Sequence, residues 1–155
     1  IDAEMKMFKG FKTPVIFLQN VIVDLMLGMG MTGLLKVFHD HVEDTYDAEA
    51  GFITMNMPHL YQTLTDIGIK NPIICSNINK VGFRTCGGLD AYEQTLRDGK
   101  LRAVAMSIFA SGAIPPREAI EWLATLPNLE SIVFGASSQR NIASTKSLVD
   151  EYFGV

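Results

Sequence analysis

A lysine follows directly on an apolar segment in the run Asn77-Ile78-Asn79-Lys80. Desolvation among neutral amides lowers the pKa of a lysine amine, which can then attack a carbonyl carbon and form a Schiff base. Lys80 is therefore the candidate catalytic residue, and Asn77 and Asn79 are candidates to orient a substrate carbonyl or hydroxyl. The simpler interpretation, which we favour, is a lysine that holds an anionic ligand or lies exposed in the following loop.

Small and polar residues near the C-terminus form a second candidate site. Small residues let backbone N–H groups face a ligand, a serine can cap a helix, and the helix dipole favours negative charge. Arg140 adds a guanidinium that can bind phosphate in a bidentate manner. An ordinary capped helix start explains the pattern equally well. The candidate cofactor-binding residues are Gly135, Ser137, Ser138, Arg140 and Asn141.

Two further motifs are weaker. Gly28 to Gly33 matches the G-x-G-x-x-G pattern of dinucleotide sites, but Asp24 interrupts the strand that should precede it, so a turn between helices is favoured. Of the cluster between His39 and Asp44, His39 and Glu43 have the spacing that places two side chains on one helix face. We predict a solvated acidic helix end there and no metal site.

Five apolar, β-branched segments alternate with stretches of helical periodicity. They are nearly continuously apolar, as is typical of parallel strands covered on both faces, and parallel strands need crossover helices. The pattern predicts one α/β domain over residues 1–155, built from five βα units. The expected strands are Val15–Leu18, Phe52–Met55, Ile73–Ile78, Ala103–Ile108 and Ser131–Phe134.

Proline and glycine residues bound the expected helices. We expect an interrupted helical stretch from Ile22 to Val42, and a last helix from about Ser138 to Phe153 whose inward face includes Ile142 and Thr145. The other helices are expected from Pro58 to Gly68, from Leu89 to Gly99, and from Pro115 to before Pro127.

Five βα units fit two architectures: part of a TIM (β/α)8 barrel, or a doubly wound open parallel sheet. Both place ligands at the carboxyl ends of the strands. The candidate substrate-binding residues at those ends are Asn20, Asn56, Asn77, Asn79 and Ser107.

Charge and composition limit the partners and the compartment. With 13 basic and 17 acidic residues, the net charge is −4, which argues against nucleic acid and anionic membranes. The apolar stretch from Pro14 to Leu35 contains Gln19, Asn20 and Asp24, which are costly in lipid. Two cysteines and no visible secretory signal predict a cytoplasmic protein.

Several segments together resemble the aldo-keto reductases, over most of the chain. The resemblance implies a TIM barrel in which Val15–Asn20 and Ile73–Asn79 stand as the fourth and sixth strands. The matching segments are Ile53–Asn56 with Pro58–Leu60, Ala103–Ser107 with Ala110–Ile114, Glu118–Leu123, and Leu129–Ser138.

In that family, the loop and helix after the eighth strand bind the phosphate end of NADP, which implies this role for Ser137, Ser138, Arg140 and Asn141. The family's catalytic tyrosine, aspartate and lysine come from strands earlier than those matched here. Its histidine at the end of strand four corresponds to Gln19 or Asn20, and its lysine after strand seven to Ser107.

The leading prediction is a TIM-barrel-type enzyme or enzyme fragment, comprising strands 4–8, that binds a phosphorylated small molecule or nucleotide. The family resemblance implies an NADP-linked oxidoreductase, and Lys80 suggests a Schiff-base lyase or aldolase as the alternative. A non-catalytic oligomeric or interaction protein is the third hypothesis. Five barrel strands leave two open edges and an uncovered apolar interior, which predicts a homo-oligomer or a missing N-terminal half.

Overall fold

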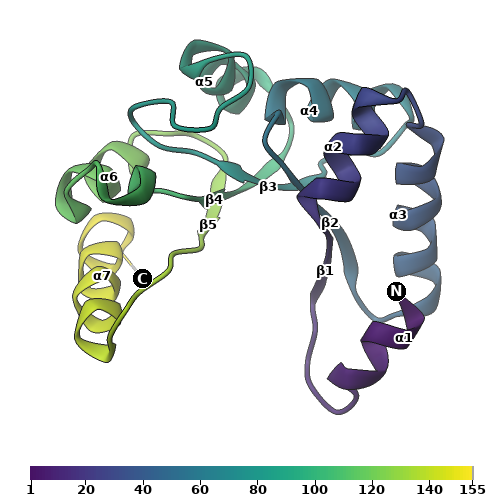
Figure 1. The fold of residues 1–155 in the computed structure, drawn as a ribbon, viewed down its shortest axis with the longest axis horizontal. Helices are drawn as coiled ribbons and strands as arrows, with labels where there is room; N and C mark the ends of the chain where they lie inside the picture. Colours follow the sequence, from purple (N-terminus) through teal and green to yellow (C-terminus); the bar gives the residue numbers. More distant parts are fainter. Residues whose placement is uncertain (155) are drawn as a thin grey trace.

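The structure is a computed structural model that describes residues 1–154, and its centre is a five-stranded, all-parallel sheet (Figure 1). The strands are β1 (Val15–Leu18), β2 (Glu49–Thr54), β3 (Ile73–Asn77), β4 (Arg102–Met106) and β5 (Leu129–Ile132). The α-helices are α1 (Asp2–Met5), α2 (Asn20–Gly28), α3 (Gly33–Thr45), α4 (Met57–Asp66), α5 (Leu89–Asp98), α6 (Pro116–Leu123) and α7 (Gln139–Phe153). Two 3-10 turns, η1 (Lys6–Phe8) and η2 (Ala110–Gly112), complete the elements.

The predicted succession of five βα units is confirmed, and all five predicted strands are present with shifts of a few residues at their ends. The interrupted stretch after β1 forms two helices, α2 and α3. Gly30, with a φ of +69°, lies in the turn between them. The Gly28–Gly33 motif therefore connects two helices and does not follow a strand, so its dinucleotide interpretation is wrong and the turn is confirmed.

Strand order in the sheet follows chain order, β1-β2-β3-β4-β5, and every neighbouring pair is parallel. Figure 1 shows the helices in an arc on one side of the strands. A doubly wound sheet has a reversal of strand order and helices on both faces. The alternative of a doubly wound sheet is therefore wrong for residues 1–154.

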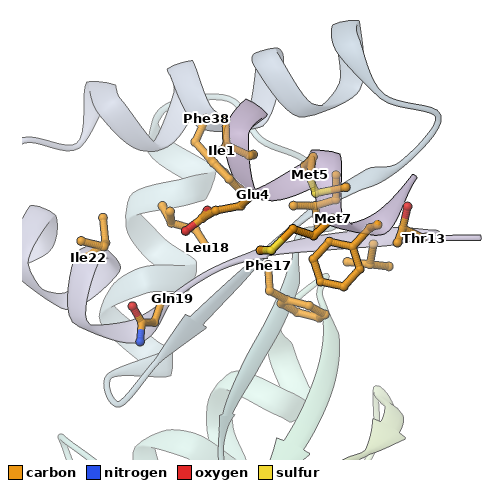
Figure 2. A pocket seen from close by; sticks show the side chains of 13 residues that line it. Ile1, Glu4, Met5, Met7, Thr13, Phe17, Leu18, Gln19, Ile22 and Phe38 are labelled. Atoms are coloured by element: carbon orange, nitrogen blue, oxygen red, sulfur yellow. The ribbon is translucent and has the colours of Figure 1, made fainter. Parts of the chain in front are cut away.

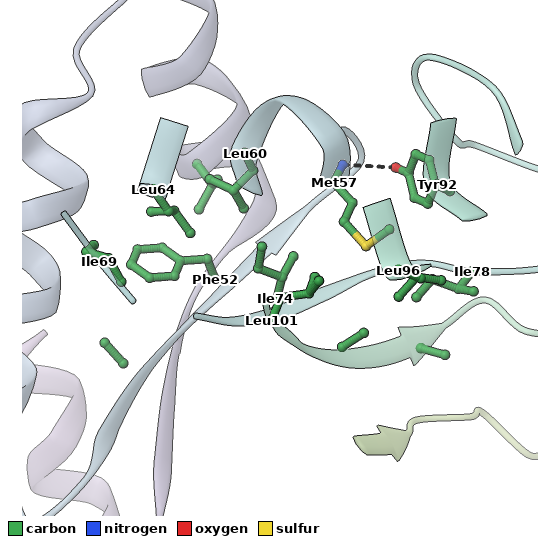
Figure 3. Close-up of a cluster of buried hydrophobic side chains, with 14 of the residues drawn as sticks. Phe52, Met57, Leu60, Leu64, Ile69, Ile74, Ile78, Tyr92, Leu96 and Leu101 are labelled. Carbon is green, nitrogen blue, oxygen red and sulfur yellow. Dashed lines mark hydrogen bonds between the residues drawn. The ribbon is translucent and has the colours of Figure 1, made fainter. Parts of the chain in front are cut away.

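The main core lies between the sheet and the helices (Figure 3). Phe52 and Ile74 point from the strands into this layer, where Leu60, Leu64 and Leu96 from the helices pack against them. All five side chains are fully buried, and burial of each contributes about 1.5–3 kcal/mol. Among the helices of residues 1–154, none combines the length and apolar character that crossing a bilayer requires.

No helix of residues 1–154 covers the opposite face of the sheet, and a hollow of about 530 Å³ lies against it. Alternate side chains of the strands line it, as expected because successive strand residues point to opposite faces. Most are apolar. At the amino ends of the strands, Arg102 pairs with Glu49, and its Nε lies 3.7 Å from Glu130. The strand residues that line the hollow are Val15, Phe17, Glu49, Ile53, Ile73, Cys75, Arg102, Val104, Met106, Glu130 and Ser131.

Buried hydrogen bonds hold the carboxyl end of β2. The Asp24 carboxylate, on α2, accepts from the Thr54 hydroxyl and from Met55 N at 3.1 Å. On the other side, Tyr92 Oη of α5 donates to Met55 O at 2.7 Å and accepts from Met57 N at 3.2 Å. These contacts fix two helices to the end of one strand.

We predict that replacement of Asp24 by alanine lowers the free energy of unfolding by about 1–3 kcal/mol, because it leaves the fully buried Thr54 hydroxyl without its acceptor. Urea denaturation followed by circular dichroism measures this loss. Asp47→Ala, at an exposed loop position, is the control and should change stability by less than about 0.5 kcal/mol. Equal effects of the two substitutions would contradict the anchoring role of Asp24.

The two cysteines should differ in reactivity. Burial raises the pKa of the Cys75 thiol from 9.0 to about 11, whereas Cys86 is exposed. Because the thiolate is the reactive form, Cys75 should react with DTNB at pH 8 at least about 100-fold more slowly than an unperturbed thiol. One thiol per chain should react quickly, and Cys86→Ser should abolish that fast phase. Two fast thiols would show that Cys75 is accessible.

Candidate functional site

Two adjacent hollows lie where β4 and β5 end, of about 310 and 300 Å³. The first lies against the loop after β4, and the second against the first turns of α7. Phe109 and Gly135 line both hollows, which therefore adjoin, and together they are called the cleft. The cleft is lined by Ser107, Ile108, Phe109, Ser111, Gly112, Pro116, Phe134, Gly135, Ala136, Ser137, Asn141, Ser144 and Thr145.

The loop after β4 is tightly curled. Ser107, Ala110 and Ser111 have φ values of 55°, 46° and 59°, in the left-handed region that costs a residue with a side chain about 1–2 kcal/mol. Hydrogen bonds from Ala110 N to Ser107 O at 2.9 Å and from Gly112 N to Phe109 O at 2.8 Å close the curl. This conformation places Phe109 as the wall shared by the two hollows.

The start of α7 borders the cleft through Ser137 and Asn141, and the donors of Ser138, Gln139 and Arg140 lie between these two residues in the chain. The Ser138 hydroxyl accepts from Asn141 N at 3.2 Å, and the Ser137 hydroxyl accepts from Asn141 Nδ2 at 3.0 Å. Both hydroxyls act as acceptors in these bonds and neither donates to another described residue, so each hydrogen can be donated to a ligand. The backbone amides of Gln139 and Arg140 precede the first intrahelical bond, from Ile142 N to Ser138 O, and have no partner within the helix.

The cleft therefore supplies donors for an anion and no proton-transfer group. Hydroxyls, a carboxamide and backbone amides line it, and the exposed Arg140 guanidinium lies on the first turn of α7. No aspartate, glutamate, histidine or lysine is among the lining residues that the structure describes. Such a site can bind and orient a phosphate group, but its own side chains do not provide a general acid or base.

The structure gives Asn77 and Asn79 a different role from the predicted one. Both are almost fully buried. Asn79 bonds Phe83 twice, from Nδ2 to Phe83 O at 2.9 Å and from Phe83 N to Oδ1 at 2.7 Å. Asn77 Nδ2 donates to Arg84 O at 3.2 Å. These amides hold the loop after β3, and one of the two donor hydrogens of each amide is already used.

The remaining candidates also lie apart from the cleft. Lys80 is exposed and forms an ion pair with Glu118 of α6 at 2.8 Å, so the desolvation that a Schiff-base lysine needs is not seen. Asn56 caps α4 by accepting from His59 N at 3.4 Å. Asn20 begins α2, beside the opposite edge strand. Of the substrate-binding candidates, only Ser107 lines the cleft, where Gly135, Ser137 and Asn141 also lie.

The sequence prediction missed Phe109, because its position between the hollows depends on the left-handed residues around it. The glycine and small residues that follow it were the available signal. Ile142 was predicted to face inward, but half of its surface is exposed. Thr145 is buried as predicted. On α3, His39 Nε2 lies 3.3 Å from Glu43, and no set of three metal-binding side chains is found in residues 1–154.

Comparison of the chain with protein-family models, with curated proteins and with solved structures found no match. The resemblance to aldo-keto reductases therefore stays a prediction from the sequence.

The role of Asn79 can be measured. Asn79→Ala leaves the Phe83 N–H and C=O groups without their partners, which we expect to lower the free energy of unfolding by about 1–3 kcal/mol. Chemical denaturation gives the value. The amide hydrogens of residues 79 to 84 should also exchange faster in the Asn79→Ala variant than in the wild-type protein. An Asn79→Ala variant with unchanged stability would indicate that the side chain is kept for a ligand instead.

Proposed function

We propose that the protein binds a phosphate-bearing small molecule in the cleft between the loop after β4 and the first turn of α7. The observation that carries this proposal is the arrangement around Asn141. Asn141 donates to the hydroxyl oxygens of Ser137 and Ser138, and neither hydroxyl donates to another described residue, so both hydrogens can be donated to a ligand. A phosphate needs such donors, and the positive end of the α7 dipole favours its charge.

The position of the cleft supports the same ligand class. In barrels and open sheets alike, ligands bind at the carboxyl ends of parallel strands, and TIM barrels often bind phosphate after their last two strands. We propose that β1 to β5 correspond to strands 4–8 of a (β/α)8 barrel. Sequential order, all-parallel pairing and helices on one side support this assignment.

The cofactor and reaction follow from the resemblance and form a more specific part of the proposal. NADP carries phosphates of the required kind, and the resemblance to aldo-keto reductases assigns its phosphate end to Ser137, Ser138, Arg140 and Asn141. Since the cleft has no acid or base, the chemistry of an oxidoreductase would need groups from outside these residues. The support for NADP is analogy with a family, and fold alone does not define activity.

Binding of inorganic phosphate and of NADP, measured by isothermal titration calorimetry, tests the proposal. Aspartate caps a helix about as well as serine, so Ser138→Asp should keep α7 stable while its charge repels the anion. We expect it to abolish phosphate binding. Arg140→Gln removes a charge-assisted hydrogen bond of about 1.5–3 kcal/mol and should weaken binding at least tenfold.

Arg97→Gln is the matched control, because Arg97 is an exposed arginine on α5, whereas Arg140 is next to the lining residue Asn141 on the first turn of α7. It should leave the affinity unchanged. Absence of binding by the wild-type protein, or equal losses in the Arg97 and Arg140 variants, would refute a specific anion site. Binding of phosphate but not of NADP would retain the anion site and refute the cofactor assignment.

A further inference from the structure

Within residues 1–154, the outer strands β1 and β5 each pair with a strand on one side only, and an apolar groove lies beside each of them. The groove beside β1 has a volume of about 650 Å³ and contains Met5, Met7 and Phe8 from the start of the chain (Figure 2). The groove beside β5 has a volume of about 340 Å³ and contains Val149 and Phe153 of α7. Free edges with apolar borders are the places where a sheet accepts another strand.

The exposed surface is larger than expected for a monomer. The accessible surface is 8929 Å², whereas folded monomers of 17.1 kDa average about 7,750 Å². The excess of about 1,200 Å² exceeds the roughly 800 Å² that each partner buries in a standard interface. Twelve of the fifteen exposed large apolar side chains in the described residues lie in the first 37 residues. Five of the twelve, Ile1, Met7, Phe8, Phe17 and Ile22, line the groove beside β1, so this groove is part of an uncovered surface large enough for a stable dimer.

We propose that a second copy of this chain covers that surface. With a twofold axis parallel to the strands, β1 of each copy pairs with β5 of the other, and all strands remain parallel. Both edge strands have four residues, so their lengths match. Two equivalent β1–β5 contacts, related by the twofold axis, close the sheet, so no described strand keeps a free edge and the apolar hollows of both copies lie inside it. The closed sheet has ten strands, and the second copy takes the place of the three further strands of an eight-stranded barrel.

Charge favours this pairing over β1 with β1. Lys9 and Lys12 precede β1, whereas Glu130 is the second residue of β5. Parallel pairing of β1 with the β5 of another copy brings these opposite charges to the same end of the sheet. Parallel pairing of β1 with β1 would bring the lysines together, which is unfavourable. Antiparallel pairing of β1 with β1 would separate the lysines but break the all-parallel order of the sheet.

The dimer would also complete the cleft. β5 is the edge strand, so the open side of the cleft faces whichever strand pairs with β5. In the proposed dimer this strand is β1 of the second copy, whose carboxyl end carries Gln19 and Asn20. Their carboxamides would then lie beside Gly135 of the first copy and add donors for the ligand. This step rests on the proposed phosphate site, whereas the dimer itself does not.

Sedimentation equilibrium of the wild-type chain gives the first test. We expect a mass of twice 17.1 kDa at micromolar concentrations. A mass of one chain up to about 100 µM would overturn the proposal and leave a different polypeptide as the occupant. A trimer or an open-ended series would also overturn it, because only two copies close the sheet in this way.

Variants locate the interface. Met7, 72% exposed, lines the groove beside β1, so Met7→Glu should weaken the dimer at least tenfold. Val37, 63% exposed on α3, lines neither edge groove, and Val37→Glu should leave dimerisation unchanged. Circular dichroism should show that both variants are folded. A dimer that resists Met7→Glu, or is lost with Val37→Glu, would place the interface elsewhere.

Titration with inorganic phosphate then separates the two proposals. If the dimer completes the cleft, Met7→Glu and Asn20→Ala should each weaken phosphate binding several-fold, although neither residue belongs to the β4 and α7 cleft. A dimer that binds no phosphate would refute the anion site and leave the dimer intact. A monomeric Met7→Glu variant with wild-type phosphate affinity would refute the completion of the cleft by a second copy.

Discussion

The structure depends on one constraint: a parallel sheet must have both of its faces covered. Crossover helices bury the face that carries Phe52 and Ile74, and they do so completely. The other face, with Phe17 and Val104, has no such cover within the described chain. The sheet also ends in two strands without outer neighbours. These features explain why apolar hollows collect around β1 and β5, and why the polar site lies at the ends of the strands.

Polar residues at the strand ends have two roles: some hold the chain together, and others can donate hydrogen bonds to a ligand. After β2 and β3 they hold the chain together: Asp24 anchors α2 to Thr54, while Asn77 and Asn79 fix the following loop. Their donors and acceptors are largely used within the protein. After β5, Ser137 and Ser138 accept hydrogen bonds but keep a hydrogen to donate. Free donor capacity, and not the presence of polar residues, distinguishes the candidate site from the loops beside it.

Local pattern predicted the elements well, because apolar runs, prolines and glycines act over a few residues. Leu89 to Gly99 and the Ser138 cap are examples. The order of the strands in the sheet could not be predicted, because the same βα units can form a sheet with or without a reversal of strand order. The partners of Asn79 and Lys80 depend on loops that periodicity does not describe. Ile142 was predicted to face inward, but half of its surface is exposed. Because α7 lies at the edge of the sheet and packs against α6, only one side of this helix is covered.

The composition of the cleft bears on how a reaction could be organised. Hydroxyls, amides and a guanidinium keep one protonation state near neutral pH, so they hold an anion without exchanging protons with it. Proton transfer needs a group whose pKa lies near the working pH, and Ser107 and Ser137 are not such groups. The edge position of β5 leaves the cleft open on one side. An acid or base for a reaction in this cleft would therefore have to come from outside its lining residues.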